Sequence, residues 1–322
     1  MKKIPNIFLS LLFFLPSVIL LFLIYAASWF YAPQTMGQSV EKVLEIPYGY
    51  NSVQIRQLLE EEGIIRPYSH LFQHTTKLMK VDGKLQTGEY RFSSSQSISQ
   101  IIDQLVKGKT IRYSITVPEG FQTKQIARLL ADKNIADHDE FLELAKREEQ
   151  FREGYLFPDT YEFPKNFGAE NVLKLMHKNF EDTVYQHVDP KQEFPAGLNF
   201  EQIIILASII EKEAQGAEDK FKIASVFYNR LKVGMPLQSC ATIQYLLGQP
   251  QEKLTQQDLD TDSPYNTYLH SGLPPGPICN PGLDSILAAV LPAQEEYFYF
   301  VLGKEGKHIF SKTYQEHLHN KP

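Results

Sequence analysis

The stretch IIILASIIEKEA, residues 203–214, decides how the carboxyl-terminal half of this chain folds. Just before it, Asn199 can cap the amino end of a helix, with Gln202 as its capping-box partner. Gly216 can end the same helix. We therefore predict a helix over residues 200–214. Because this helix is apolar nearly all round, we expect it to be buried at the centre of a domain.

The predicted helix carries a carboxylate, Glu211, directly after its apolar run. A carboxylate at this place is either a solvated helix end or a proton donor. Burial beside Ile209 and Ile210 would disfavour the charged form, and can raise the pKa of a glutamate to about 6–7, where it becomes a competent general acid. Glu213 is the obvious rival, but it lies about 200° further around the helix, so the two side chains cannot share one site. The spacing alone leaves both interpretations of Glu211 open.

The composition fits a globular protein of two ordinary domains. The chain has 322 residues, of which 43% are hydrophobic and 22% are charged, so a sizeable core can form. Its net charge of −6 argues against a nucleic-acid partner, because no basic face is expected to dominate.

Several common catalytic and cofactor motifs do not occur in the sequence. There is no HExxH metal motif, no glycine-rich phosphate loop and no GxSxG nucleophile motif. His317 and His319 form an isolated HxH pair, which we interpret as solvated rather than metal-binding. We therefore predict neither a metal nor a cofactor.

The amino-terminal segment has the composition of a membrane anchor. Residues 4–32 contain no charged side chain, and Lys2 and Lys3 precede them. A helix of that length can cross a hydrocarbon core of about 30 Å, and the stretch is longer than the apolar region of about 7–15 residues in a signal peptide. The small residues 26–28 keep cleavage open as an alternative.

From this segment we predict a single-pass protein of the cytoplasmic (inner) membrane. The basic amino terminus should stay in the cytoplasm. Residues 1–33 would then form the cytoplasmic tip and transmembrane helix, with the lipid bilayer as a partner. Residues 33–322 would lie in the periplasm or outside the cell.

An internal repeat runs through the middle of the chain. IPYGYNSVQIRQLLEEEGI, residues 46–64, resembles VPEGFQTKQIARLLADKNI, residues 117–135, and the offset of 71 continues without a gap to the aromatic residues at 90–92 and 161–163. Each copy reads as a short strand, a Pro-x-Gly turn, an amphipathic helix, a second helical segment and an extended end. The alternatives are duplication of one module and chance similarity, and the ungapped register favours duplication.

The remaining carboxyl-terminal sequence mixes helical and strand patterns. Residues 182–198 read as a connection, because two prolines and a glycine interrupt the pattern. Residues 261–282 are too rich in polar and aromatic side chains to be a mere connector. The other expected elements are helices at 219–234 and 285–291, a short helix within 235–248, and a hairpin with strands at 297–302 and 308–311. We therefore predict an α+β fold.

These motifs together resemble the endolytic murein transglycosylases of the YceG-like family. The resemblance covers nearly the whole chain, through IPYGYN, LQTGEYRF, VPEG, GYLFPDTYEFP, ASIIEKEA, IASVFYNRL, MPLQSCATIQY, SPYNTY, GLPPGPI and HIFS in that order. It implies a LysM-like α/β module at residues 34–115 and a mixed helical and β catalytic domain at residues 116–322. Within that domain, residues 116–181 resemble a second copy of the module.

For Glu211, the resemblance implies the role of catalytic acid, because the family's acid is the first glutamate of the EKE element. The implied substrate is the glycan strand of peptidoglycan, cut at its MurNAc–GlcNAc bonds. One carboxylate can suffice, because it protonates the glycosidic oxygen and then takes the proton of the muramyl 6-hydroxyl, which closes a 1,6-anhydro ring. The family also suggests peptidoglycan synthases as partners.

Six further residues should line the glycan cleft when the family's motifs are carried over. They are Gln238 and Ser239 of LQS and Tyr265, Asn266, Thr267 and Tyr268 of YNTY. Sugars bind to aromatic faces and to well-placed amide and hydroxyl groups, although each of these residues could instead serve only in a turn. The sequence departs from the family at Cys240, where many relatives have an acid.

The two cysteines of the chain, Cys240 and Cys279, lie in the loop-like motifs LQSCAT and GPICNPG. Both motifs are expected to flank the same cleft, and a disulfide can persist outside the cytoplasm. Neither cysteine has a metal-ligand spacing. We predict a disulfide between them, and the alternative is two thiols that pack as small apolar side chains.

Two other classes of function stay open beside the lytic transglycosylase. One is a non-catalytic protein that binds peptidoglycan, in which the duplicated module holds the glycan and the carboxyl-terminal half is a scaffold. The other is a muramidase-type hydrolase, which would add water instead of closing an anhydro ring.

Overall fold

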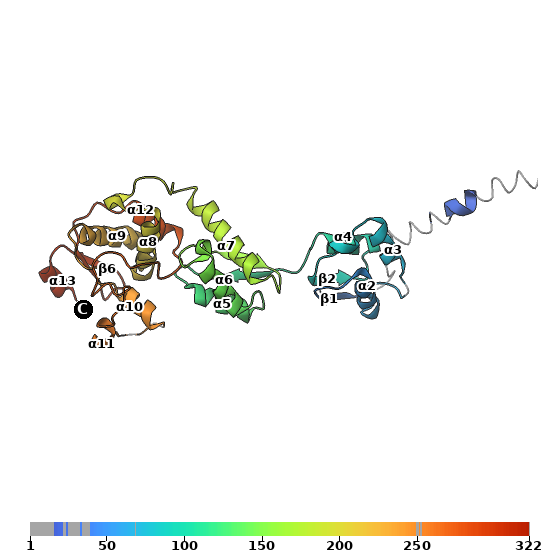
Figure 1. Cartoon of the computed structure of the whole chain (residues 1–322), viewed down its shortest axis with the longest axis horizontal. Helices are drawn as coiled ribbons and strands as arrows, with labels where there is room; N and C mark the ends of the chain where they lie inside the picture. The colour runs from blue at the N-terminus through green and yellow to red at the C-terminus, as the bar shows by residue number, and fades with distance from the viewer. Residues whose placement is uncertain are drawn as a thin grey trace, which may run out of the picture. The chain divides into compact units, whose positions relative to one another are not determined.

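The computed structural model describes residues 16–21, 24, 33, 39–67, 69–248, 251 and 253–321 (Figure 1). The chain divides into two compact units, residues 1–113 and 114–322. In the described residues, many helices are combined with three sheets of two strands each. The prediction of an α+β fold is therefore confirmed.

The first unit is built on an antiparallel strand pair, β1 (Glu41–Ile46) and β2 (Gly88–Ser93), in which Ile46 lies opposite Gly88. Tyr90 and Phe92 point from β2 into the core and are fully buried, as the alternation along a strand requires. The other elements of this unit are α2 (Ser52–Glu61), α3 (Leu71–Leu78), the 3-10 turn η1 (Asp82–Lys84) and α4 (Ile98–Val106).

Helix α2 forms for reasons that can be read from its sequence. The Asn51 side chain accepts a hydrogen bond from the backbone N–H of Gln54 at 3.1 Å, and the Gln54 side chain accepts one from the backbone N–H of Asn51 at 3.0 Å. This capping box satisfies N–H groups that the helix itself leaves unpaired. Ile55 and Leu59, one turn apart, are fully buried in the core of the unit.

The second unit contains the remaining elements. In chain order they are β3 (Tyr113–Thr116, which starts on the last residue of the first unit), α5 (Thr123–Asp132), α6 (His138–Arg147), η2 (Glu149–Phe151), β4 (Thr160–Phe163), α7 (Ala169–Val184), η3 (Pro195–Gly197), α8 (Phe200–Glu213), α9 (Ala217–Lys232), α10 (Cys240–Leu247), α11 (Gln256–Leu259), α12 (Leu283–Val290), β5 (Tyr299–Leu302), β6 (His308–Ser311) and α13 (Tyr314–Asn320). Strand β3 pairs with β4, and β5 pairs with β6.

Helix α8 lies at the centre of this unit, packed against α9 and α12, which also contact each other (Figure 1). Every residue from Ile203 to Ile210 is buried, which confirms the prediction of a central, nearly all-apolar helix. Asn199 caps its start in a capping box with Gln202, as predicted. The helix ends at Glu213, one residue before the predicted end, because the backbone of Ala214 is already extended.

The other carboxyl-terminal elements lie close to their predicted positions. Helix α9 starts two residues earlier than predicted, helix α12 covers 283–290 instead of 285–291, and β6 has the predicted bounds. Strand β5 starts at Tyr299 instead of Tyr297, because the carbonyls of Tyr297 and Phe298 accept hydrogen bonds from side chains of α9, Asn229 Nδ2 at 2.8 Å and Arg230 Nε at 2.7 Å.

The same contacts recur in the two segments that share the offset of 71 residues. The hydroxyls of Tyr90 and Tyr161 each donate to the backbone carbonyl four residues earlier, at 2.8 and 2.5 Å. Each ring also stacks on the phenylalanine two residues later, with centroids 5.5 Å apart in both segments. The two segments therefore share local geometry as well as sequence.

The predicted membrane anchor must be corrected. Most of residues 4–32 lie outside the described residues. Among those that the structure does describe, no helix is both long enough and apolar enough to cross a membrane. On this finding, the predicted single-pass localisation, with the bilayer as a partner, is not supported.

A buried asparagine, Asn280, joins three segments of the second unit. Its Oδ1 accepts from the backbone N–H of Gly154 at 2.9 Å and of Leu156 at 3.0 Å. Its Nδ2 donates to the carbonyl of Phe121 at 3.1 Å and to Glu153 Oε1 at 2.8 Å. The loop before α12 is thereby fixed to the turn before α5 and to the segment before β4.

Glu153 is the acidic member of this cluster. It accepts from the backbone N–H of Thr123 at 2.9 Å and from the Thr123 hydroxyl at 3.0 Å, besides the bond from Asn280. Burial outweighs these hydrogen bonds and raises the pKa of Glu153 from 4.5 to about 7. The folded chain therefore keeps a proton on Glu153 where the unfolded chain has lost it.

We expect the variant Glu153→Gln to be more stable than the wild type at pH 8. Between pH 4.5 and about 7 the unfolded chain releases the Glu153 proton and the folded chain does not, so this group's contribution to stability falls as the pH rises and is lost above pH 7. Glutamine stays neutral and can accept the same bonds at Oε1. The gain at pH 8 should be about 3 kcal/mol, from roughly 1.4 kcal/mol per pH unit.

Urea unfolding of both proteins at pH 4, 6 and 8 measures this difference, which should vanish near pH 4. Glu143→Gln, at an exposed position of α6, is the control and should show no such pH dependence. A difference between Glu153→Gln and the wild type that is the same at all three pH values would contradict the prediction.

Candidate active site

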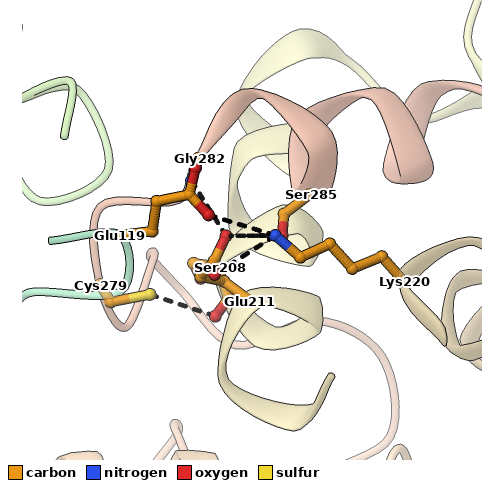
Figure 2. A network of polar contacts seen from close by, with 7 residues as sticks. All are labelled: Glu119, Ser208, Glu211, Lys220, Cys279, Gly282 and Ser285. Atoms are coloured by element: carbon orange, nitrogen blue, oxygen red, sulfur yellow. Dashed lines mark hydrogen bonds and ion pairs between the residues drawn. The ribbon is translucent and has the colours of Figure 1, made fainter. Parts of the chain in front are cut away.

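The last turn of α8 places Glu211 where two helices and a loop converge. Its side chain is only 8% exposed. Lys220 reaches it from α9, Ser285 from α12, and the backbone of Gly282 from the loop before α12 (Figure 2). The Glu211 carboxylate is therefore enclosed by its neighbours and is not a solvated helix end.

The two oxygens of Glu211 have different surroundings. Oε2 accepts from the backbone N–H of Gly282 at 3.0 Å and from the Ser285 hydroxyl at 2.6 Å. The Lys220 ammonium lies 3.3 Å from Oε2 and 3.4 Å from Oε1. The two neutral donors hold one oxygen in place, and among the described residues only the cation binds the other.

Lys220 is a cation shared by two carboxylates. Its side chain is 9% exposed, and its ammonium lies 3.3 Å from Glu119 Oε2 as well as from Glu211 Oε2 (Figure 2). Glu119 belongs to the turn before α5, and its side chain is 52% exposed. The site thus combines a nearly buried carboxylate, a nearly buried cation and a half-exposed carboxylate.

Lys220 and Glu119 are members of this site that the sequence did not predict. From the residues of its own helix alone, Glu211 is expected to lie among apolar neighbours. The signals were present, because Glu119 stands in the motif VPEG and Lys220 directly precedes the segment FKIASVFYNRL. Neither motif by itself shows that the chain brings the two side chains together.

Two glycines allow this close approach. A Cβ on Gly282 would lie 2.0 Å from Glu119 Oε1, so a larger residue would displace the Glu119 carboxylate. Gly120 adopts φ +75° and passes against α8, where a Cβ would lie 3.5 Å from Cγ of Glu211. Only glycine adopts this φ readily, so the turn that carries Glu119 depends on it.

The loop before α12 is also attached to α8 one turn ahead of Glu211. The Ser208 hydroxyl accepts from the backbone N–H of Ile278 at 3.0 Å, and the Cys279 thiol donates to the carbonyl of Ser208 at 3.3 Å. Burial raises the pKa of the Cys279 thiol well above its usual value, so the thiol stays protonated. These contacts fix the position of Gly282 relative to Glu211.

The predicted disulfide does not form in the structure, where both cysteines are free. Cys279 is fully buried and directed at α8, whereas Cys240 is exposed at the start of α10 with its sulfur 3.0 Å from the Tyr268 hydroxyl. The two loops are held by separate sets of hydrogen bonds. Position in neighbouring loops was not sufficient to predict a bond, because it does not specify where the side chains point.

The structure brings the LQS and YNTY motifs together. The backbone N–H of Gln238 donates to the carbonyl of Thr267 at 3.0 Å, and that of Ser239 donates to the Thr267 hydroxyl at 3.0 Å. Asn266 is fully buried and its amide donates to the carbonyls of Leu259 and Thr261, both at 2.8 Å. Internal hydrogen bonds therefore engage the polar groups of Asn266 and Thr267.

The bond between Gln238 and Thr267 joins the two motifs through their backbones. Gln238 itself adopts φ +51° and its side chain is exposed, and Tyr265 and Tyr268 are partly exposed. Of the six predicted cleft residues, these three leave side-chain surface open to solvent, whereas Ser239, Asn266 and Thr267 are buried.

Glu213 binds the LQS motif and not Glu211. The Ser239 hydroxyl donates a short hydrogen bond to Glu213 Oε1, and the backbone N–H of Ala241 donates to the same oxygen at 3.4 Å. Burial raises the pKa of Glu213 above its usual value, although these two donors act in the opposite direction. The two glutamates of EKE therefore serve different neighbours, as the angle between them on the helix predicted.

The residues that could bind a metal ion include His317 of the isolated HxH pair. The ring of His317 stacks on Tyr299 with centroids 5.3 Å apart, and burial lowers the pKa of His317. Among the described residues, no group of three or more His, Cys, Asp or Glu side chains is placed to hold a metal ion.

A large cavity lies elsewhere in the second unit. It has a volume of about 1190 Å³. Among the residues that line it are Ile205 of α8, Tyr228 of α9 and Pro274 of the loop between α11 and α12. Neither Glu211 nor Lys220 lines it. We place the candidate active site at Glu211, because a site is identified by its reactive groups as well as by its volume.

The chain is similar to known proteins along most of its length. Residues 44–322 match the model of the YceG-like family. The endolytic murein transglycosylase of Bacillus subtilis (strain 168) is 35% identical over 299 residues, which cover 85% of this chain and 82% of that protein. The protein of the same name from Streptococcus pneumoniae (serotype 2, strain D39) is 29% identical over 320 residues, which cover 85% of this chain and 57% of that protein.

A solved structure is similar as well. The crystal structure of a yceG-like protein from Listeria monocytogenes is 34% identical in sequence and has a TM-score of 0.56, and the match covers 88% of this chain and 100% of that one. The resemblance predicted from the sequence is confirmed: this chain belongs to the YceG-like family.

Proposed function

We propose that this protein is an endolytic murein transglycosylase, a lyase that cleaves MurNAc–GlcNAc bonds within peptidoglycan strands and leaves 1,6-anhydro ends. The observation that carries the proposal is the enclosed carboxylate of Glu211, held by one cation and two neutral donors, in a chain whose relatives bear that name. Cleavage within nascent strands would trim or terminate them.

In this proposal Glu211 acts first as an acid and then as a base. Its proton passes to the glycosidic oxygen as the bond to the anomeric carbon breaks. The same carboxylate then takes the proton of the muramyl 6-hydroxyl, whose oxygen forms the new bond to that carbon. The proton count is restored at the end of the cycle, and no water is consumed.

The hydrogen bonds around Glu211 favour one of its oxygens for this task. Gly282 and Ser285 both donate to Oε2, so that oxygen cannot readily carry the transferred proton. Within the described part of the chain, Oε1 is bound by Lys220 alone, at 3.4 Å. We assign Oε1 as the oxygen that faces the glycosidic bond, because a general acid must be within hydrogen-bond reach of its substrate.

A hydrolase is the second candidate, and a specific observation supports it. Hydrolases of this kind usually need two carboxylates, and Glu119 is a second carboxylate beside the same lysine. Glu119 could assist a water molecule instead of leaving the 6-hydroxyl to attack. The ends of the products distinguish these two reactions.

Other side chains of the second unit would hold the glycan beside Glu211. Gln238, Tyr265 and Tyr268 would contact the sugar, while Ser239, Asn266 and Thr267 shape the loop that presents them. Aromatic faces and exposed amides are suited to sugar rings.

Residues 34–115 would form a LysM-like module that binds the strand, residues 116–181 a second copy of it, and residues 116–322 the catalytic domain. The shared local geometry of the two segments supports a common origin. Such a protein would work beside peptidoglycan synthases, which produce the strands that it cuts.

Glu211→Gln should fold and bind glycan but lose activity by roughly 10²–10⁴-fold, the usual contribution of a general acid. Glutamine keeps the shape of the side chain and an oxygen for the Gly282 and Ser285 donors, but it has no proton to give. The rate of release of soluble fragments from purified peptidoglycan measures the loss.

Glu213→Gln is the matched control, two residues further along the same helix. It retains an acceptor for the Ser239 hydroxyl, so its activity should stay within about tenfold of the wild type. A large loss in Glu213→Gln with little loss in Glu211→Gln would show that the wrong glutamate has been assigned.

The products should carry 1,6-anhydro ends when purified glycan strands are digested and analysed by mass spectrometry. An anhydro end is lighter by one water than the reducing end that a hydrolase leaves. Reducing ends would favour the hydrolase, and unchanged strands would favour the non-catalytic scaffold.

A further inference from the structure

Lys220 is almost fully enclosed and yet carries a positive charge that two carboxylates share. Its ammonium is 3.3 Å from Glu119 Oε2, 3.3 Å from Glu211 Oε2 and 3.4 Å from Glu211 Oε1 (Figure 2). A buried charge needs a counter-charge, because removal of one partner of a buried pair is strongly destabilising. Lys220 has two such partners, where one would satisfy this requirement.

The second partner matters because the first must change its charge. An acid catalyst has to carry a proton before it can give it away, and a neighbouring ammonium favours the ionised carboxylate instead. If Glu211 were the only partner of Lys220, protonation of Glu211 would leave the lysine charge enclosed and unpaired. This would oppose the protonated state that the reaction requires.

We propose that Glu119 is a positioning residue that holds Lys220 while Glu211 takes up and releases its proton. The inference rests on the proposed function of Glu211 as the acid. With Glu211 protonated, Lys220 and Glu119 form a neutral pair. With Glu211 ionised, the three side chains carry one net negative charge, and the half-exposed Glu119 lets solvent stabilise it.

The turn that carries Glu119 is fixed by one hydrogen bond to the loop before α12 and by one within the turn. The backbone N–H of Gly120 donates to the carbonyl of Asn280 at 2.9 Å, and that of Phe121 donates to the carbonyl of Pro118 at 3.3 Å. Gly282 leaves the space that the Glu119 carboxylate occupies. One loop therefore supplies both the N–H that binds Glu211 and the room for Glu119.

None of the other charged and titratable groups around Glu211 is a second carboxylate partner for Lys220. Lys212, on the same helix, directs its ammonium at the carbonyl of Gly120 at 3.4 Å. The Cys279 thiol on the facing loop is neutral, because burial raises its pKa. From α12 the contact is a hydroxyl, that of Ser285, and Glu153 binds Thr123 and Asn280 instead.

Glu119→Gln should therefore change the pH profile of the enzyme. With Lys220 paired only to Glu211, the ionised form of Glu211 is favoured, and activity should be lost at a lower pH on the alkaline side. We expect the alkaline limb of kcat/KM to move down by about one pH unit, so that activity well above the limb falls about tenfold while activity below it is nearly kept. Glu119→Asp, which keeps the charge, should recover part of the shift.

The control is Glu218→Gln, at an exposed position in the first turn of α9, which should leave the limb in place. Gly282→Ala is a second variant that displaces the Glu119 carboxylate without removing it, and it should move the limb in the same direction. Circular dichroism of each variant establishes that it is folded.

Two results would overturn the inference. One is an unchanged profile in Glu119→Gln, and the other is an equal loss of activity at every pH, which would give Glu119 a different role. Failure of the proposed function would be seen in other proteins. The wild type would give products without anhydro ends, or Glu211→Gln would keep its activity.

Discussion

The burial of helix α8 on nearly every side is the constraint on which the second unit depends. Eight consecutive residues, Ile203 to Ile210, are enclosed, so the helix must be covered by α9, by α12 and by the loop before α12. The next residue is a glutamate, and enclosing a carboxylate is costly unless its charge is paired and its oxygens accept hydrogen bonds. The elements that cover the helix provide these partners as Lys220, Ser285 and Gly282.

The part of this arrangement that depends on local rules could be predicted from the sequence. The cap of α8 by Asn199 and the burial of its apolar run follow from residues within one or two turns, and Glu211 stands out at the end of that run. Lys220 and Glu119 are 101 residues apart, and only the complete fold brings them together. The expected disulfide was wrong for the same reason, because the direction of each thiol depends on distant contacts with α8 and with the YNTY motif.

The resemblance to the family implies an acid at the position of Cys240, and the neighbouring contacts hold this loop without one. The loop that contains Cys240 is held by Glu213, which accepts from Ser239 and Ala241, and by the bonds of Ser239 to Thr267. Its position therefore does not require a carboxylate at residue 240. The second glutamate of EKE supports the loop, and the first remains available for chemistry.

The two segments that share the offset of 71 residues put the same turn to different uses. In both, a backbone N–H donates across a Pro-x-Gly turn to the proline carbonyl, from Tyr50 to Pro47 at 3.4 Å and from Phe121 to Pro118 at 3.3 Å. The middle residue of the first turn, Tyr48, is 95% exposed. Its counterpart in the second turn is Glu119, which reaches Lys220. A turn geometry that is maintained by proline and glycine leaves its middle residue free to vary, and in the second segment that residue has become part of the site around Glu211.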